Sequence, residues 1–277
     1  MLSQELALLK KIQLLISKKL NTLFVGEYHS AFKGHGLEFD NVREYQYGDD
    51  IKNIDWNVSA RMNNLYIKEY IEERELSIVL MVDISRSLYF GSQKSKKEVL
   101  LEMVTFLLYL AQMNNDRASV LLFSNLAEKY LTPQKGRKFI LKVLNEIIHY
   151  TPQNKGTNIA AGINFLQRVL KKRSVIFILS DFLDVKEDYL LKLRLLSRKH
   201  DIIPIQISDP LEKEMKFFGL TEFLDLETGK VFLSDSLPEK GNFPFLNEFS
   251  TIFLNTNEPI DRPILKFFET RNKTKLM

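Results

Sequence analysis

The sequence contains no cysteine, and this absence excludes several classes of protein at once. Without thiols the chain has no disulfide framework, no thiolate zinc or iron–sulfur site and no cysteine nucleophile. Only four histidines are present among the 277 residues, so any metal site would use mainly oxygen ligands. The lack of cysteine also fits a reducing compartment, and we expect a cytoplasmic protein.

Long apolar runs are absent as well. The longest uncharged apolar run, residues 103–113, falls short of the ~20 residues that a membrane-spanning helix needs. The first residues place Glu5 and several lysines inside an apolar stretch, which is not the order of parts in a signal peptide. The 39 lysines and arginines against 35 acids form a mixed surface that does not indicate nucleic-acid binding.

Residues 3–20 predict an amphipathic helix, with one apolar face and a cluster of lysines beside it. Two interpretations of this helix stay open. It either packs on its own domain, which we favour, or its lysines make a peripheral contact with anionic lipid at the inner membrane.

The rest of the chain changes pattern twice. Residues 22–75 combine glycines and polar residues with short alternating pieces, which are typical of loops and solvated strands. Continuous apolar runs then alternate with helical periods up to residue 210. We therefore expect a central domain over 76–210, an N-terminal helix and loop/strand segment over 1–75, and a C-terminal extension over 211–277 packed on the same unit.

The central segment predicts an α/β domain with a doubly wound, mostly parallel sheet, because strands and helices alternate. The runs at 76–83 and 174–181 do not alternate, as in strands buried on both faces. We expect Pro133 to stop its strand and Pro204 to mark an edge strand. The expected strands are 76–83, 118–124, 128–133, 174–181 and 202–209, and the expected helices are 96–115, 136–150, 157–172 and 187–200.

The C-terminal extension predicts a hairpin and two helices. Residues 222–235 form two alternating runs around a turn at 227–229. Helical stretches are expected at 243–255 and 262–271.

Two aspartates, Asp83 and Asp181, end the two most apolar strands. Ligands of open α/β sheets bind beyond the carboxyl ends of the strands, so these carboxylates converge if the strands are neighbours. Convergent carboxylates repel each other unless a cation neutralises them. Ser85 and Ser87 in the loop after the first strand, and Thr157 before a helix, add three hydroxyls. This all-oxygen set predicts a single Mg²⁺ or Mn²⁺ ion.

Other interpretations of these residues stay open. The aspartates can be strand-end caps without a metal, and Thr157 or Asn158 can cap the helix that follows. The lysines at 94, 96 and 97 either form a solvated helix face or guide an acidic partner to the site.

A metal-dependent hydrolase, either a phosphatase or a nuclease, is the alternative function, because such enzymes also use strand-end carboxylates. A phosphatase with an aspartyl nucleophile would want an acid where this chain has Ser85. A nuclease would want more acids at the site, and Asp116 precedes its strand, which puts it at the wrong end.

The five oxygen-bearing positions resemble the metal-ion-dependent adhesion site of von Willebrand factor A domains, with D-x-S-x-S, a later Thr and a later Asp. Further motifs are GHGLEF at 34–39, VREYQYGDD at 42–50, NIDW at 53–56 and PILKFFETR at 263–271. Their order resembles the "domain of unknown function 58" family of bacterial A-domain proteins, often encoded beside MoxR-type AAA+ ATPases.

The resemblance implies a von Willebrand factor A-like, or Rossmann-like, fold and a partner-binding module rather than an enzyme. It implies a metal ion with an open position, which takes an Asp or Glu from a protein partner. That partner is expected to be a MoxR-like ATPase or a client protein in assembly or maturation. The chain has no ATP-binding motif of its own, so energy would come from the partner.

The N-terminal segment also contains a dense group of polar and aromatic residues. We interpret this group either as a partner-binding surface or, as we favour, as a salt-bridge brace that holds the segment on the A-like domain. Trp56, the only tryptophan, is expected to be buried. Acids within the group would repel phosphate, so we expect no nucleic-acid partner. The group consists of Arg43, Tyr45, Asp49, Asp50, Asp55, Trp56 and Arg61.

Overall fold

The computed structural model describes residues 27–28, 31–32, 37–72, 75–153, 156–183, 188–214, 216–224, 231–236 and 248–275. The predicted helix over 3–20 and the predicted turn at 227–229 lie outside the described residues.

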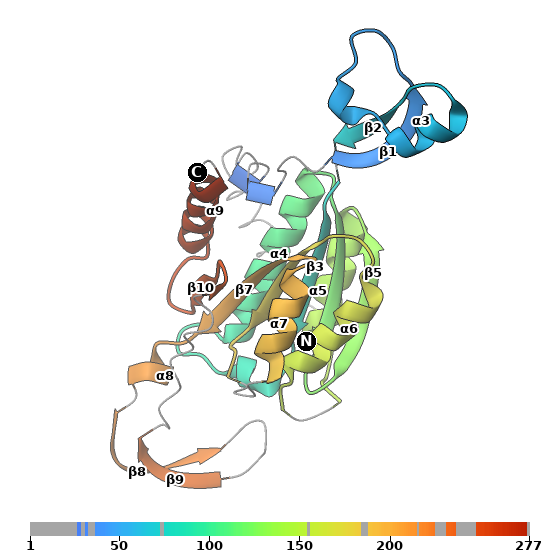
Figure 1. The fold of residues 1–277 in the computed structure, drawn as a ribbon. Coiled ribbons are helices and arrows are strands. Elements are labelled where there is room, and N and C mark those ends of the chain that lie inside the picture. Colours follow the sequence, from blue (N-terminus) through green and yellow to red (C-terminus); the bar gives the residue numbers. More distant parts are fainter. Residues whose placement is uncertain are drawn as a thin grey trace.

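Six strands form the main sheet (Figure 1), in the spatial order β10-β7-β6-β3-β4-β5. All neighbouring strands are parallel except β4 and β5, which are antiparallel. The predicted doubly wound, mostly parallel α/β fold is therefore confirmed. The strands are β3 (Ser77–Asp83), β4 (Arg117–Phe123), β5 (Ala127–Gln134), β6 (Val175–Ser180), β7 (Asp201–Ser208) and β10 (Ile252–Asn255).

Helices cover both faces of this sheet, and each face has its own hydrophobic core. On one face, Leu80 of β3 and Phe177 of β6 lie in a cluster with side chains of α4, α5 and α9. On the other face, Met81 and Ile178 lie in a cluster with α6 and α7. The continuous apolar runs are thus explained, because β3 and β6 are buried on both sides. The helices are α4 (Lys96–Met113), α5 (Arg137–His149), α6 (Ile159–Val169), α7 (Asp188–Ser197) and α9 (Asp261–Lys275).

Helix α4 contains the longest uncharged apolar run and lies in the core. It begins with a capping box, in which Ser95 and Glu98 each accept a backbone N–H of the other residue. Leucine, valine and phenylalanine side chains along most of its length are buried. Among the described residues, no helix has the length and apolar character to cross a membrane.

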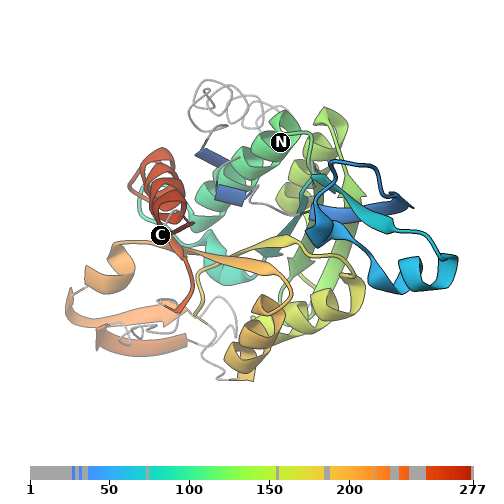
Figure 2. The ribbon, with the colours of Figure 1, turned by 45° about the horizontal axis from the view of Figure 1, so that its top comes forward.

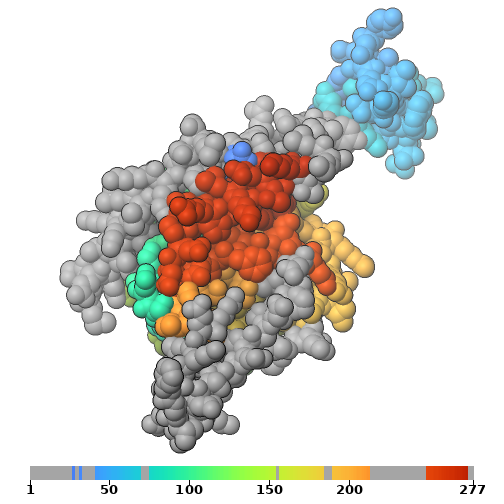
Figure 3. All heavy atoms as spheres, turned by 90° about the vertical axis from the view of Figure 1, so that its left-hand side faces the viewer, coloured from blue at the N-terminus to red at the C-terminus, as the bar shows by residue number. Residues whose placement is uncertain are grey.

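A small lobe precedes the sheet and stands apart from it (Figures 1 and 3). Its strands β1 (Leu37–Glu44) and β2 (Tyr66–Glu72) are antiparallel. A 3-10 turn, η1 (Ile51–Asn53), and the short helix α3 (Trp56–Met62) connect the two strands. The predicted strands of this segment are present as β1 and β2, but the helix α3 was not predicted. Tyr28 and Phe32, which were expected in loops or solvated strands, are helical and buried in the main core.

The C-terminal segment adds β10 and α9 to the main unit and a separate hairpin. The short helix α8 (Leu211–Glu214) leads into β8 (Lys216–Leu224) and β9 (Val231–Ser236), which pair as the predicted antiparallel hairpin. Figures 1 and 2 show this hairpin at the opposite end of the molecule from the lobe. The expected helix over 262–271 is confirmed as part of α9.

Three local predictions are wrong. Residues 252–255 form strand β10 instead of part of a helix, because they pair with β7. Strand β5 continues past Pro133 to Gln134, which an outermost strand tolerates because its free side needs no N–H. Pro204 lies in β7, which is an inner strand. Pairing with β10 begins only at Ile205, so no partner on that side meets Pro204 itself.

Candidate functional site

The two predicted strand-end acids lie side by side, because β3 and β6 are neighbours in register. Val82 of β3 pairs with Leu179 of β6, one residue before Asp83 and two before Asp181. Both aspartates are buried, with 0% and 2% of their surfaces exposed. The two strands that carry these acids are therefore neighbours, as the expected site requires.

Asp83 holds the loop that carries the two serines. Its Oδ1 accepts the backbone N–H of Ser85 at 2.8 Å, and its Oδ2 accepts the hydroxyl of Ser180 at 2.6 Å. The hydroxyl oxygens of Ser85 and Ser87 lie 2.9 Å apart. Burial, and then the charge of Asp181, raise the pKa of Asp83 to about 7. A carboxyl in this setting lacks a compensating positive charge of its own.

Asp181 has such a charge in Lys96. The Lys96 Nζ lies 2.6 Å from Asp181 Oδ2 and 2.8 Å from Glu212 Oε1, and the lysine side chain is fully buried. Burial alone would lower the pKa of Lys96, but the two carboxylates outweigh it and raise that pKa above its ordinary value. The interpretation of residue 96 as part of a solvated lysine face is therefore wrong. Lys94, by contrast, is exposed and pairs with Glu102.

Thr157 lies at the same edge of the sheet, in a turn that Gly156 makes with a φ of 85°. The neighbouring Asn158 donates its backbone N–H to the carbonyl of Ser124, just beyond the end of β4. The Asn158 side chain accepts the N–H of Ala161 and caps α6. Of the two caps that the sequence allowed, the structure therefore has Asn158, and Thr157 is left to other contacts.

A third strand-end acid, Asp209, was not predicted. Its carboxylate accepts the N–H of Ser92 at 2.8 Å, the hydroxyl of Ser92 at 3.0 Å and the N–H of Leu211 at 2.9 Å. The hydroxyl of Thr256 is a further donor. The sequence could have indicated it, because the run IIPIQISD at 202–209 ends in an aspartate, as do the runs that end in Asp83 and Asp181. Asp209 fastens the segments after β7 and β10 to the loop that precedes α4.

The charged residues of the lobe contact one another. Arg43 donates to both oxygens of Asp49, at 2.7 and 2.8 Å, and to Glu69 at 2.6 Å. These contacts lower the pKa of Asp49 to about 2, chiefly through the hydrogen bonds from Arg43. The ion pairs of Arg43 and Asp55 join parts of the lobe to each other, so they brace the lobe itself.

The other lobe residues cap and close its turns. Asp50 caps η1, and Asp55 caps α3 and lies 3.6 Å from Lys68. Tyr45 donates its backbone N–H to Leu65. Arg61 is exposed in the last turn of α3. Whether any of these residues binds a partner stays a prediction.

Trp56 is 65% exposed, so the expectation of a buried tryptophan is wrong. It is the first residue of α3, a seven-residue helix in a lobe where the described elements supply few side chains to cover it. We expect its fluorescence emission to match that of free tryptophan in water. A neutral quencher such as acrylamide should reach it freely, and denaturant should change either property little. A blue-shifted, protected emission would contradict the exposed position.

The predicted metal ligands are of the right chemistry for a hard cation. In the part of the chain that the structure describes, no three His, Cys, Asp or Glu side chains gather in a group that could hold a metal ion. The predicted set is of another kind, with two carboxylates and three hydroxyls, to which water molecules would add. Lys96 neutralises part of the charge of Asp181, whereas the hydrogen bonds that Asp83 accepts come from neutral groups, the Ser85 N–H and the Ser180 hydroxyl.

Comparisons with known proteins agree with this fold. Uncharacterized protein Rv1480 of Mycobacterium tuberculosis is 28% identical over 228 residues, which cover 81% of this chain and 72% of that protein. Uncharacterized protein Mb1516 of Mycobacterium bovis matches with the same identity and coverage.

Two solved structures share the fold. An aerotolerance-related membrane protein from Bacteroides fragilis, with multiple mutations to serines, aligns with a TM-score of 0.52 at 17% identity. The conserved hypothetical protein BatB from Bacteroides thetaiotaomicron aligns with a TM-score of 0.52 at 15% identity. Both alignments cover 72% of this chain and 99% of the other. The family model described as "Protein of unknown function DUF58" matches residues 41–240, and the chain therefore belongs to the DUF58 family.

Proposed function

We propose that this protein is a protein-binding module whose strand-end site holds one Mg²⁺ or Mn²⁺ ion and captures an acidic side chain of a partner. Asp83, Ser85, Ser87 and Thr157 would hold the ion, and Asp181 would contribute its charge beside Lys96. A bound divalent cation supplies a coordination position that an Asp or Glu from outside can fill. The von Willebrand factor A-like fold supports the assignment as an interaction module.

The observation that carries the proposal is the convergence of one carboxylate and two hydroxyls in a single loop. The Ser85 N–H fixes Asp83, and the hydroxyls of Ser85 and Ser87 lie 2.9 Å apart. Lys96 neutralises part of the negative charge through its contacts with Asp181 and Glu212, which lie outside this loop. Neutral hydroxyl ligands leave a cation most of its charge, so it keeps affinity for an incoming carboxylate.

We expect the affinity for Mg²⁺ to depend on pH around the raised pKa of Asp83, about 7. Below this pH, cation binding has to displace a proton, so affinity should fall about tenfold per pH unit and level off above it. Without a cation, the folded state should lose stability as the pH rises from about 4 to about 7, because the unfolded carboxyl ionises more readily. Calorimetric Mg²⁺ titrations between about pH 6 and pH 8 measure the affinity, and urea unfolding without a cation between about pH 4 and pH 7 measures the stability. An affinity that does not change with pH would contradict this assignment of Asp83.

We propose a MoxR-like AAA+ ATPase, or a client protein handled by it, as the partner. The family resemblance supports this choice, and the chain itself lacks an ATP-binding motif. A purified MoxR-type ATPase should bind the wild type in Mg²⁺ and lose binding to Ser87→Ala. The hydroxyl deletion separates this site from the Mg²⁺ that the ATPase needs for its own nucleotide. Ser197→Ala, at the end of α7, removes a hydroxyl elsewhere and should leave binding unchanged.

We propose binding without turnover. A phosphatase or nuclease would release phosphate or cleave nucleic acid in Mg²⁺ or Mn²⁺ and lose that activity in Asp83→Asn. Generic phosphate esters and single-stranded DNA serve as the substrates of this test. Metal-dependent turnover lost in Asp83→Asn would replace the binding proposal with the hydrolase.

A further inference from the structure

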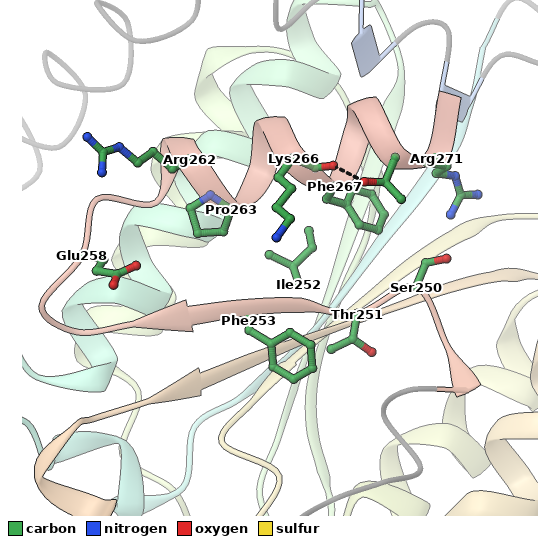
Figure 4. Close-up of a pocket in the computed structure, with 11 residues that line it drawn as sticks. Ser250, Thr251, Ile252, Phe253, Glu258, Arg262, Pro263, Lys266, Phe267 and Arg271 are labelled. Atoms are coloured by element: carbon green, nitrogen blue, oxygen red, sulfur yellow. Dashed lines mark hydrogen bonds between the residues drawn. The ribbon is translucent and has the colours of Figure 1, made fainter. Parts of the chain in front are cut away.

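A second surface, on the far edge of the sheet, has the features of a peptide-binding site. A pocket of about 810 Å³ lies between β10 and α9 (Figure 4). Its lining includes Phe253 on the strand, and Arg262 and Lys266 on the helix. Figure 3 shows β10 and α9 together forming an exposed surface of the molecule. None of the proposed metal ligands lines this pocket.

The outer edge of β10 offers backbone groups for pairing. Strand β10 is the last strand of the sheet among the described residues, with β7 on its inner side. Thr256 donates its N–H to Ser208, and the Leu254 carbonyl accepts the Ser208 hydroxyl, so both residues face β7. Backbone groups alternate in direction along a strand, so the N–H and C=O of Phe253 face outwards. This edge can therefore accept another strand.

The charge beside this edge is positive. Arg262 and Lys266 are exposed and lie one turn apart on α9, and no ion pair of either is found in the described part of the chain. Arg271 is already occupied, because it pairs with Asp201 and donates to the carbonyl of Ala31. Glu258 is the one acid among the lining residues. Two cations thus remain to receive an acidic ligand.

The two sides of the strand differ in chemistry. Figure 4 shows Lys266 reaching from α9 towards Ile252, whereas the Phe253 ring lies on the opposite side of β10. The Phe253 side chain is 53% exposed. A strand added at this edge would place alternate residues on the Lys266 side and on the Phe253 side. The matching sequence alternates acidic with apolar residues.

We propose that the edge of β10 binds an extended segment of a partner protein, with alternating acidic and apolar residues, by strand addition. Main-chain hydrogen bonds to Phe253 would supply affinity, and Arg262 and Lys266 would select the acids. A second copy of this chain fits less well, because pairing two β10 edges would bring the same cations together. Nucleic acid lacks the alternating backbone donors and acceptors that a strand edge requires.

The test measures binding of fluorescent peptides to the full chain in EDTA, so failure of the metal site cannot affect it. An eight-residue peptide that alternates glutamate and valine should bind the wild type. The double charge reversal Arg262→Glu with Lys266→Glu should weaken binding at least tenfold. The double reversal Lys138→Glu with Lys142→Glu, one turn apart on the exposed surface of α5, changes the net charge equally and should have little effect.

A second peptide, N-methylated at every residue, tests strand addition without altering the protein. It should bind at least tenfold more weakly than the parent peptide, because it cannot donate to the edge. Equal binding by the two peptides, or equal binding by the wild type and the double reversal, would overturn the proposal. Tighter binding of a single-stranded DNA oligonucleotide than of the acidic peptide would also overturn it.

Discussion

Replacing Lys96 by methionine should destabilise the protein by about 3–5 kcal/mol, the typical cost of breaking a buried ion pair. The substitution keeps an unbranched chain of similar size in the core, but it removes the ammonium between Asp181 and Glu212. Lys96 and its two partners are each less than a tenth exposed, so water cannot replace the lost charge. For a chain of this size the melting temperature should fall by about 10 °C.

Two further variants separate the charge effect from packing. Lys94→Met makes the same change two residues earlier, where the lysine is exposed and paired with Glu102, and should cost at most about 1 kcal/mol. Adding Glu212→Gln to Lys96→Met should restore part of the loss, since it removes one of the two unpaired carboxylates. A loss of similar size in Lys94→Met, or no coupling with Glu212→Gln, would refute the buried ion-pair account.

Asp209→Ala should cost about 2–3 kcal/mol, because it leaves the buried hydroxyl of Thr256 and the partly buried N–H groups of Ser92 and Leu211 without their acceptor. The carboxylate joins Ser92, Leu211 and Thr256, which belong to three segments that are far apart in the sequence. Ser92→Ala removes only one of these contacts through its hydroxyl and should cost about 1 kcal/mol. Urea unfolding of both variants measures the difference, and equal small losses would contradict a central role for Asp209.

The pH dependence of stability gives an independent check on Asp209. Burial raises its pKa, but the hydrogen bonds from Thr256, Ser92 and Leu211 lower it more, so the net shift is downwards. A carboxyl with a lowered pKa stabilises the folded state above its unfolded pKa of about 3.9, and this contribution is lost as the pH falls further. Asp209→Asn should therefore lose less stability than the wild type on acidification below about pH 4.

The central sheet could be predicted because each of its strands is identified by a local pattern of apolar residues. The apolar runs of β3 and β6 are buried on both faces, and their short length and β-branched residues favour strands over helices. The acids that follow them could be placed at one edge from topology alone. Asp83, Ser85 and Ser87 lie within five residues of one another, so their convergence needed no long-range information.

Lys96 could not be predicted because its burial depends on distant residues. In the sequence it stands in a run with lysines at 94 and 97, which is typical of an exposed helix start. Its partners are 85 and 116 residues further along the chain. The prediction that Trp56 is buried was wrong because a large aromatic side chain is buried only where enough chain surrounds it. Pro204 lies just before the residues of β7 that pair with β10, and β7 is not an edge strand.

The central claim is that the loop over residues 83–87 forms a cation site. Thermal unfolding in a Mg²⁺ titration tests this claim most directly. At about one hundred times the dissociation constant, a bound ion stabilises the folded state by about 2.7 kcal/mol. The wild type and Ser197→Ala should therefore melt about 5–10 °C higher at saturation. Ser87→Ala should need more Mg²⁺ for the same shift, with its ion-free stability nearly unchanged because Ser87 is only half-buried. An absent shift in the wild type, or the same titration curve in Ser87→Ala, would contradict the claim.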